Sequence, residues 1–300
     1  SPSLPVLLMN PEARNAMDHD AELLASAESV PYKQLDEHTH LTAHVFFPPG
    51  ERAGQSRPAI LFFYGSGFDT GSPTQFAPHA LNFSSRGAVS ILIDYRTRHT
   101  HQASPLDAMR DARSAVRWAR FYSTQLGIDP ARVVVAGALA GGCIAAAAAM
   151  KPDLSDDRTD PAEVDGRPNA ALLYSPLLEI GKGGYGSAAF AETDTPLSEA
   201  ALARFIGKGL PPMLIIHGVE DRITPIETVE KFAHRMRKKK NDCRLLPFDG
   251  RQHSFYNLNV DPVAYDACNA EVDHFLVETG FLDPAPEITD GDLGEVQELK

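Results

Sequence analysis

The sequence predicts an α/β protein with a mainly parallel central sheet that helices cover on both faces. Short apolar, β-branched runs alternate with segments of helical periodicity from about residue 41 to residue 278. Strands that are separated by helices pair in parallel, because the crossover brings the chain back to the same end of the sheet. A glycine-rich turn, Gly137–Gly142, also joins an apolar run directly to an alanine-rich helix, which is typical of this class.

The first half of the chain contains three predicted strands and one long predicted helix. The strands are short apolar or β-rich runs bounded by proline, glycine or charge, namely Leu41–Phe47, Ala59–Phe63 and Val89–Asp94. The helix is expected over about 105–125 because Ala108, Ala112 and Val116 recur at helical spacing. Pro105 suits its first turn, where the missing N–H is not needed. Residues 1–30 are weakly patterned and are expected to form an arm with a short helix around 18–27.

The second half continues the alternation. After the run Val133–Ala136 and the alanine helix, an acidic, proline-containing loop is expected over 151–167. The later elements are expected at strands Ala170–Tyr174 and Met213–His217, helix Ile226–Lys239, strand Arg244–Phe248 and helix Pro262–Glu278. Residues 180–209 interrupt the pattern and are expected to form a small cap or lid. The folded domain is therefore expected over 31–282, followed by an acidic tail over 283–300.

Composition excludes several function classes. The net charge of −12 disfavours nucleic acid and anionic membrane surfaces as partners, because phosphate would be repelled. No apolar run is long enough to span a bilayer. Three scattered cysteines, Cys143, Cys243 and Cys268, are too few for a disulfide framework or a zinc site and are expected to be buried thiols. No cofactor or metal is predicted. No leader is visible at Ser1, which leaves location open between the cytoplasm and export with the leader removed; the oligomeric state is also open.

Two motifs resemble binding sites but do not predict one in this sequence. Residues 181–186 match Gly-x-Gly-x-x-Gly, but a nucleotide site would need this loop to leave a strand directly and enter a helix. Several residues, including Pro176, separate it from the preceding strand, so a lid segment is favoured. The basic cluster 235–240 ends a predicted helix, where positive charge complements the helix dipole.

The segment Gly137–Gly141 has the spacing of a nucleophile elbow. In that motif, a strained strand-to-helix turn lifts a serine hydroxyl above the sheet. Leu139 occupies the serine's position. Because an isobutyl group cannot attack a carbonyl, the sequence predicts a framework for ester chemistry that lacks the attacking atom.

Three further signals each follow a predicted strand, and the acid precedes the histidine in the chain. The glycines of the Tyr64–Phe68 segment would let backbone N–H groups face a developing oxyanion. Asp221 follows one apolar strand, and His253 follows the next. Oriented by the carboxylate, this histidine would act as a general base near neutral pH. Taken singly, they are more often a glycine turn, a cap or turn residue, and a surface or packing histidine. Their order in the chain, each just after a strand, makes the combination specific.

With the runs Asp94–Arg96 and Leu126–Arg132 added, the chain resembles the α/β-hydrolase esterase/lipase family over about residues 32–281. It is close to acetyl-esterase, carbohydrate-esterase and hormone-sensitive-lipase-like members. The resemblance implies the α/β-hydrolase fold with a small cap and a carboxylic-ester-hydrolase-like site. The ligand implied is an ester-like or apolar small molecule.

The resemblance also implies roles for residues. Asp221 and His253 would be the acid and base of a triad whose nucleophile position holds Leu139. The backbone N–H groups of Gly65, Ser66 and Ala140 would form the oxyanion hole. Two departures from the family pattern flank this hole: Tyr64 stands where histidine is usual, and a serine replaces a loop glycine at 66.

Four functions fit these residues. The first is an ester hydrolase with an unusual nucleophile, for which Ser66 suits better than Cys143 or Ser254. The second is a catalyst whose His253 activates water or abstracts a proton. The third is a non-catalytic binding protein, and the fourth is a variant of a natural serine enzyme. The retained Asp221–His253 pair argues against binding alone, since buried polar groups cost free energy. The prediction adopted is a hydrolase-family protein in which ordinary serine acyl transfer is absent or very weak.

Overall fold

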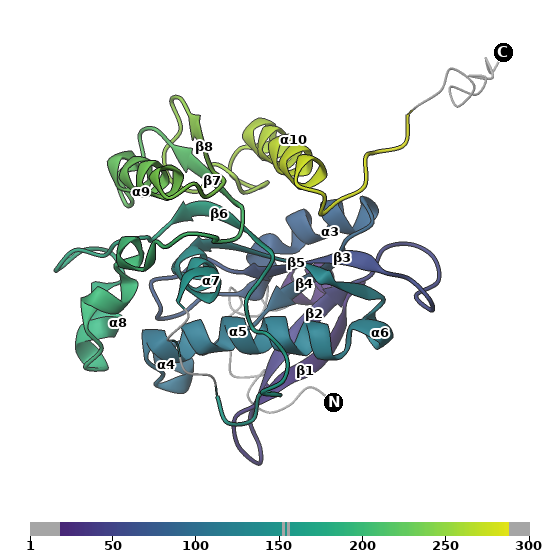
Figure 1. Cartoon of the computed structure of the whole chain (residues 1–300). Coiled ribbons are helices and arrows are strands. Elements are labelled where there is room, and N and C mark those ends of the chain that lie inside the picture. Colours follow the sequence, from purple (N-terminus) through teal and green to yellow (C-terminus); the bar gives the residue numbers. More distant parts are fainter. Residues whose placement is uncertain (1–18, 152–153, 155–156, 288–300) are drawn as a thin grey trace.

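The computed structural model describes residues 19–151, 154 and 157–287 (Figure 1). Its centre is an eight-stranded sheet in the order β1-β2-β4-β3-β5-β6-β7-β8. The strands are β1 (Glu28–Gln34), β2 (His40–Phe46), β3 (Arg57–Phe63), β4 (Val89–Ile93), β5 (Ile128–Leu139), β6 (Ala170–Pro176), β7 (Met213–Gly218) and β8 (Cys243–Phe248). β2 runs antiparallel to both of its neighbours, and the other pairs are parallel. The predicted α/β class with a mainly parallel sheet is confirmed.

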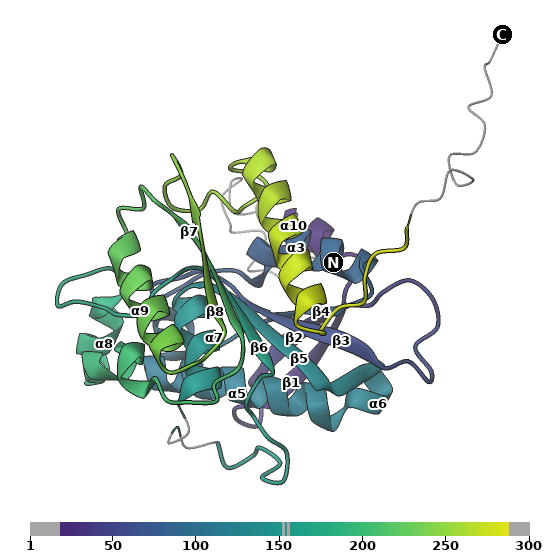
Figure 2. The same ribbon diagram turned by 45° about the horizontal axis from the view of Figure 1, so that its top comes forward.

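Helices cover both faces of the sheet (Figure 2). They are η1 (Pro73–Phe76), α3 (Ala77–Ser85), α4 (Arg98–His101), α5 (Pro105–Phe121), α6 (Ser123–Leu126), α7 (Ala140–Met150), α8 (Ser187–Glu192), η2 (Leu197–Ala200), η3 (Leu202–Phe205), α9 (Ile226–Lys238) and α10 (Pro262–Glu278). One buried apolar cluster joins the sheet to α5, α7 and α9, and a second joins its other face to α3 and α10.

The central strands are continuous apolar runs because both of their sides are buried. In β3, Leu61 and Phe63 belong to the first apolar cluster, whereas Ile60 and Phe62 belong to the second. This alternation follows from the two-residue period of a strand. The carboxyl ends of β3, β5, β7 and β8 therefore lie along one edge of a rigid layer, where the loops that follow them gather.

The longest elements that were not predicted are β1 and α3. β1 was assigned in part to an N-terminal arm, but it pairs with β2 at the sheet edge, with a register shift between Pro31 and Lys33. Proline and an irregular pattern are typical of edge strands and weaken the sequence signal. α3 was missed as well. The helix expected over 105–125 ends at Phe121, and α6 is a separate turn that ends at Gly127, which has a φ of 66°.

Several predictions fall outside the described residues. They include most of the arm (1–18), the end of the acidic tail (288–300) and four residues of the acidic loop (152–153 and 155–156). The segment 180–209 contains α8, η2 and η3 between β6 and β7, and its role as a lid stays a prediction. All three cysteines are buried, as expected. Within the described ranges no helix has the length and apolarity needed to cross a membrane.

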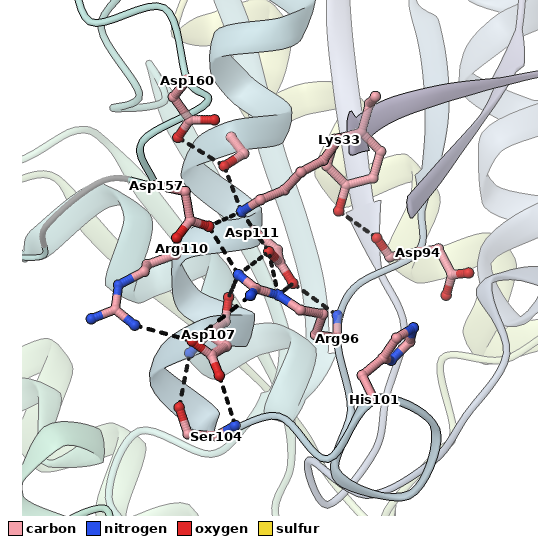
Figure 3. Close-up of polar contacts among 12 residues, drawn as sticks. Lys33, Asp94, Arg96, His101, Ser104, Asp107, Arg110, Asp111, Asp157 and Asp160 are labelled. Atoms are coloured by element: carbon pink, nitrogen blue, oxygen red, sulfur yellow. Dashed lines mark hydrogen bonds and ion pairs between the residues drawn. The ribbon is translucent and has the colours of Figure 1, made fainter. Parts of the chain in front are cut away.

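A buried cluster of charges ties β1 and the segment after β4 to α5 (Figure 3). Asp111 of α5 is fully buried and accepts hydrogen bonds from Lys33 at 2.7 Å and from the Arg96 side chain at 2.8 Å. Asp157 also pairs with both cations. The cluster fixes Tyr95, the neighbour of Arg96, beneath the loop that follows β3.

Candidate active site

The elbow is formed as the sequence predicts, with Leu139 at its tip. Leu139 ends β5, precedes α7 and has φ 49° and ψ −119°, a conformation that side-chain-bearing residues rarely adopt. A Cβ atom on Gly141 would lie 2.2 Å from the Phe63 carbonyl oxygen, and one on Gly137 would lie 2.2 Å from the Gly141 carbonyl oxygen. The flanking glycines are therefore required for the close approach of strand and helix.

The loops after β7 and β8 bring Asp221 and His253 together. His253 Nδ1 lies 2.6 Å from Asp221 Oδ2. The same carboxylate accepts the Thr224 hydroxyl at 2.8 Å and the backbone N–H groups of Ile223 and Thr224 at 2.8 and 2.9 Å. Burial alone would raise the pKa of Asp221, but the hydrogen bonds from His253 and Thr224 outweigh it and lower the pKa to about 2. Ionised Asp221 therefore makes Nδ1 the donor in this pair.

The other nitrogen of the His253 ring takes no part in the contact with Asp221. Nε2 is buried and has no hydrogen-bond partner within the described part of the chain. Because Nδ1 carries the proton, Nε2 presents a lone pair in the neutral ring. This arrangement suits a general base that a carboxylate orients, a role of His253 that stays a prediction.

A second histidine supports the pair and was missed as a functional residue. His217 is fully buried at the end of β7, with Nε2 2.6 Å from the Thr224 carbonyl oxygen and 3.7 Å from Asp221 Oδ2. Burial lowers its pKa, which favours a neutral ring that donates to Thr224. Its place at a strand end was the only sequence signal. It holds the loop in which Asp221 accepts its hydrogen bonds.

The three predicted oxyanion donors differ in their present partners. The Gly65 N–H donates to Gln75 Oε1 at 2.5 Å, and the Ala140 N–H donates to the Ser66 carbonyl oxygen at 3.2 Å. The Ser66 N–H has no acceptor among the residues that the structure describes. In this conformation, two of the three groups donate to protein atoms. Their role in binding an oxyanion stays a prediction.

The Ser66 hydroxyl holds its own loop. Its Oγ lies 2.7 Å from the Tyr95 hydroxyl and accepts the Phe68 N–H at 3.1 Å. Because the Tyr95 hydroxyl donates to the Tyr64 carbonyl oxygen at 2.8 Å, Ser66 donates its own proton to Tyr95. The Tyr64 and Tyr95 rings stack with centroids 4.3 Å apart. Both hydroxyls are thus used within the loop, which disfavours Ser66 as a nucleophile.

Cys143 is no better placed. It is fully buried in α7, and burial raises the pKa of its thiol to about 12. The reactive form of cysteine is the thiolate, which is scarce at neutral pH for such a group.

Two cavities are lined by residues that neighbour Asp221 or His253. One, of about 620 Å³, is lined by Gly65 of the oxyanion loop and by Ser254, the neighbour of His253. The other, of about 390 Å³, is lined by Thr224 and by Tyr185 of the predicted cap. Both volumes fall in the range of small-molecule sites. Within the described ranges, no group of three or more metal-ligating side chains is found.

Comparisons with known proteins identify the family of the chain. Residues 44–168 match the BD-FAE family and residues 191–278 match the prolyl oligopeptidase family. An esterase from Thermogutta terrifontis with propionate bound is 35% identical, with a TM-score of 0.82 over 88% of this chain and 98% of that chain. The chain belongs to the α/β-hydrolase esterase/lipase family.

More distant relatives are longer proteins. Endo-1,4-beta-xylanase B of Butyrivibrio fibrisolvens is 26% identical over 61% of this chain and 30% of its own length. A probable carboxylic ester hydrolase of Mycobacterium tuberculosis is 24% identical over 74% of this chain and 54% of its own length. The chain thus spans about half or less of these curated relatives. It is an esterase/lipase-like α/β-hydrolase with leucine at the elbow tip.

Proposed function

We propose that this hydrolase binds ester-like small molecules at the elbow and that ordinary acyl transfer through residue 139 is absent or very weak. The observation that carries the proposal is the leucine at the tip of an otherwise complete elbow, in a chain whose Asp221 and His253 are hydrogen-bonded to each other. Acyl transfer needs a hydroxyl or thiol whose proton the histidine can accept. Leu139 has neither.

The ligand class follows from the cavities and from the relatives. The larger cavity is lined by both apolar and hydrogen-bonding side chains, such as Leu258 and Asn257, which suits a neutral ligand with a polar group. Structures of the Thermogutta terrifontis esterase contain propionate and butyrate. We therefore expect esters of short carboxylic acids to fit this chain.

A second candidate function is non-covalent catalysis by His253, and the partnerless Nε2 favours it. In that reaction, a water oxygen attacks the ester carbonyl carbon while His253 Nε2 takes the water proton. The carbon–oxygen bond to the leaving alkoxide then breaks, and the alkoxide takes that proton. Loss of a triad serine leaves only the modest rate enhancement of binding and the oxyanion hole, so any such turnover would be slow.

Two further alternatives have distinct signatures. A non-catalytic binding protein would retain ligand affinity when His253 is replaced and would show no turnover. A variant of a natural serine enzyme would gain full esterase activity from one change at position 139. The engaged hydroxyl of Ser66 argues against the remaining alternative, an active hydrolase that uses this serine.

Hydrolysis of p-nitrophenyl acetate and butyrate tests the proposal. We expect no turnover above background for the chain as it stands and clear turnover for Leu139→Ser. Leu139→Ala is the matched control, because it opens the same space without adding a hydroxyl. Ordinary esterase rates in the unchanged chain that His253→Ala abolishes would overturn the proposal. A folded Leu139→Ser protein without activity would show that the site is not intact.

A further inference from the structure

Two side-chain amides join the oxyanion loop to the histidine loop. The Gly65 N–H donates to Gln75 Oε1 at 2.5 Å, and Gln75 Nε2 donates to Asn257 Oδ1 at 3.3 Å. Asn257 Nδ2 then donates to the Ser254 carbonyl oxygen at 3.1 Å. Gly65 lies beside the predicted oxyanion donor Ser66, and Ser254 follows His253 in the chain. The two loops are therefore connected by three consecutive hydrogen bonds, called the amide relay below.

The direction of the amide relay is fixed at both ends by backbone groups. The Gly65 N–H can only donate, so the Gln75 oxygen faces it and the Gln75 NH₂ group faces away. That NH₂ group needs the oxygen of Asn257, which leaves the Asn257 NH₂ group for the Ser254 carbonyl, an obligatory acceptor. Reversing either amide would place two donors or two acceptors in contact. The two side chains thus have one mutually consistent orientation.

Local backbone structure holds both amides in place. Gln75 lies in η1, which the Ser72 side chain caps by accepting the Thr74 N–H. Asn257 is 9% exposed, and its own N–H also donates to the Ser254 carbonyl at 3.1 Å. Ser254 has a φ of 68°, which side-chain-bearing residues adopt only where the surroundings enforce it. The bonds to its carbonyl oxygen are part of that enforcement.

We propose that Gln75 and Asn257 are positioning residues that set the placement of the oxyanion loop relative to His253. Because Gln75 occupies the Gly65 N–H, the donor left for an oxyanion in this loop is that of Ser66. Gly65, Gln75, Ser254 and Asn257 all line the cavity of about 620 Å³, so a ligand there contacts the amide relay directly. The proposal depends on the proposed function only for the roles of the two loops, one as the source of oxyanion donors and the other as the carrier of His253.

Isosteric substitutions break single links of the amide relay. Gln75→Glu keeps an oxygen for Gly65 but removes the donor toward Asn257. Asn257→Asp keeps an oxygen for Gln75 but removes the side-chain donor toward Ser254. Asn259→Asp is the matched control, because Asn259 lines the same cavity and makes no hydrogen bond to the amide relay. Asn257→Ala tests the same link without adding charge.

Amide hydrogen exchange, read by NMR on the chain with Leu139 unchanged, tests the coupling directly. We expect Asn257→Asp and Asn257→Ala to speed exchange of the Gly65 amide about tenfold, although its own acceptor is still present. We expect Gln75→Glu to speed exchange of the Asn257 backbone N–H by a similar factor. Asn259→Asp should change the exchange of neither backbone N–H. Unchanged exchange at the far end of the amide relay in folded variants, or an equal change in the control, would overturn the proposal.

Kinetics in the Leu139→Ser background test the consequence for the site. Small misplacements of reacting groups reduce turnover by large factors, so Gln75→Glu and Asn257→Asp should each lower kcat on the order of tenfold and change KM by a smaller factor. The double variant should lose no more than the worse single one, because one broken link already uncouples the loops. Additive losses would contradict the amide relay. If Leu139→Ser is inert but the exchange result holds, the proposed function fails and the amide relay stands.

Discussion

His253 and Asp221, which are 32 residues apart, meet through a hydrogen bond of 2.6 Å between Nδ1 and Oδ2. The Asp221 carboxylate also accepts hydrogen bonds from the backbone N–H and the hydroxyl of Thr224, which hold it in the orientation that His253 meets. The bond to Asp221 leaves Nε2 of the histidine without a partner within the described residues. The side chain at the tip of the elbow, Leu139, in turn has no hydroxyl or thiol proton to give up.

Asp221→Asn should lower stability in a pH-dependent manner. The pKa of Asp221 is about 2, below its ordinary value of 3.8, so its ionised form stabilises the fold above pH 4 and that contribution is lost as the pH falls toward 2. The shift corresponds to about 2 kcal/mol at pH 7 and to roughly half of that at pH 3. Urea unfolding of both proteins at the two pH values measures it. An equal difference at pH 7 and pH 3 would contradict this linkage.

Asp94→Asn should stabilise the protein at high pH. Burial, together with the charge of Asp111, raises the pKa of Asp94 to about 6, so its ionised form costs stability progressively as the pH rises from about 4 to 6. Removing that charge should add up to about 3 kcal/mol at pH 8 and nothing below pH 4. Denaturant midpoints at pH 8 and pH 4 report the change. Asp249→Asn, at an exposed position, controls for net charge and should show no such gain.

Lys33→Met should destabilise the fold far more than Arg52→Met. Lys33 is 6% exposed, and its loss leaves the fully buried Asp111 with one cation fewer, at an expected cost of about 3 kcal/mol or more. Arg52 pairs with Glu28 at the surface, where such pairs contribute about 0–1 kcal/mol. Lys33 belongs to β1 and Arg52 pairs with Glu28 of the same strand, so the two changes remove ion pairs of one strand that differ in burial. Equal losses in urea unfolding would refute the importance of burial here.

Gly141→Ala should disrupt the elbow. The added methyl group would lie 2.2 Å from the Phe63 carbonyl oxygen and 2.3 Å from that of Tyr64, and backbone atoms cannot move aside cheaply. We expect a loss of about 3 kcal/mol or more, or failure to fold. Gly181→Ala has no atom within 4 Å of its new methyl group and should be nearly neutral. Thermal unfolding of the two proteins compares them, and similar melting temperatures would argue against a tightly packed elbow.

The sequence was informative where local pattern and chain order decide the structure. The glycines around Leu139 predicted the elbow because only they permit its close backbone contacts. Asp221 and His253 were brought together by inference because both follow strands that end at one sheet edge. The hydrogen bond between them agrees with that inference, while their catalytic roles stay proposals.

Other features depend on contacts that no local pattern encodes. The use of the Gly65 N–H by Gln75 arises from the position of η1 over the loop after β3. The engagement of Ser66 depends on Tyr95, which the buried charges around Arg96 hold in place. β1 was missed because an edge strand with a proline carries a weak alternation.

The intact mass of the protein after exposure to paraoxon tests the central claim most directly. Such compounds form a covalent bond with an activated nucleophile, and a structure of the Thermogutta terrifontis esterase is phosphorylated by paraoxon. We predict no adduct on the chain as it stands, and one phosphoryl adduct at position 139 in Leu139→Ser that His253→Ala suppresses. An adduct on the unchanged chain, or none on a folded Leu139→Ser protein, would contradict the account.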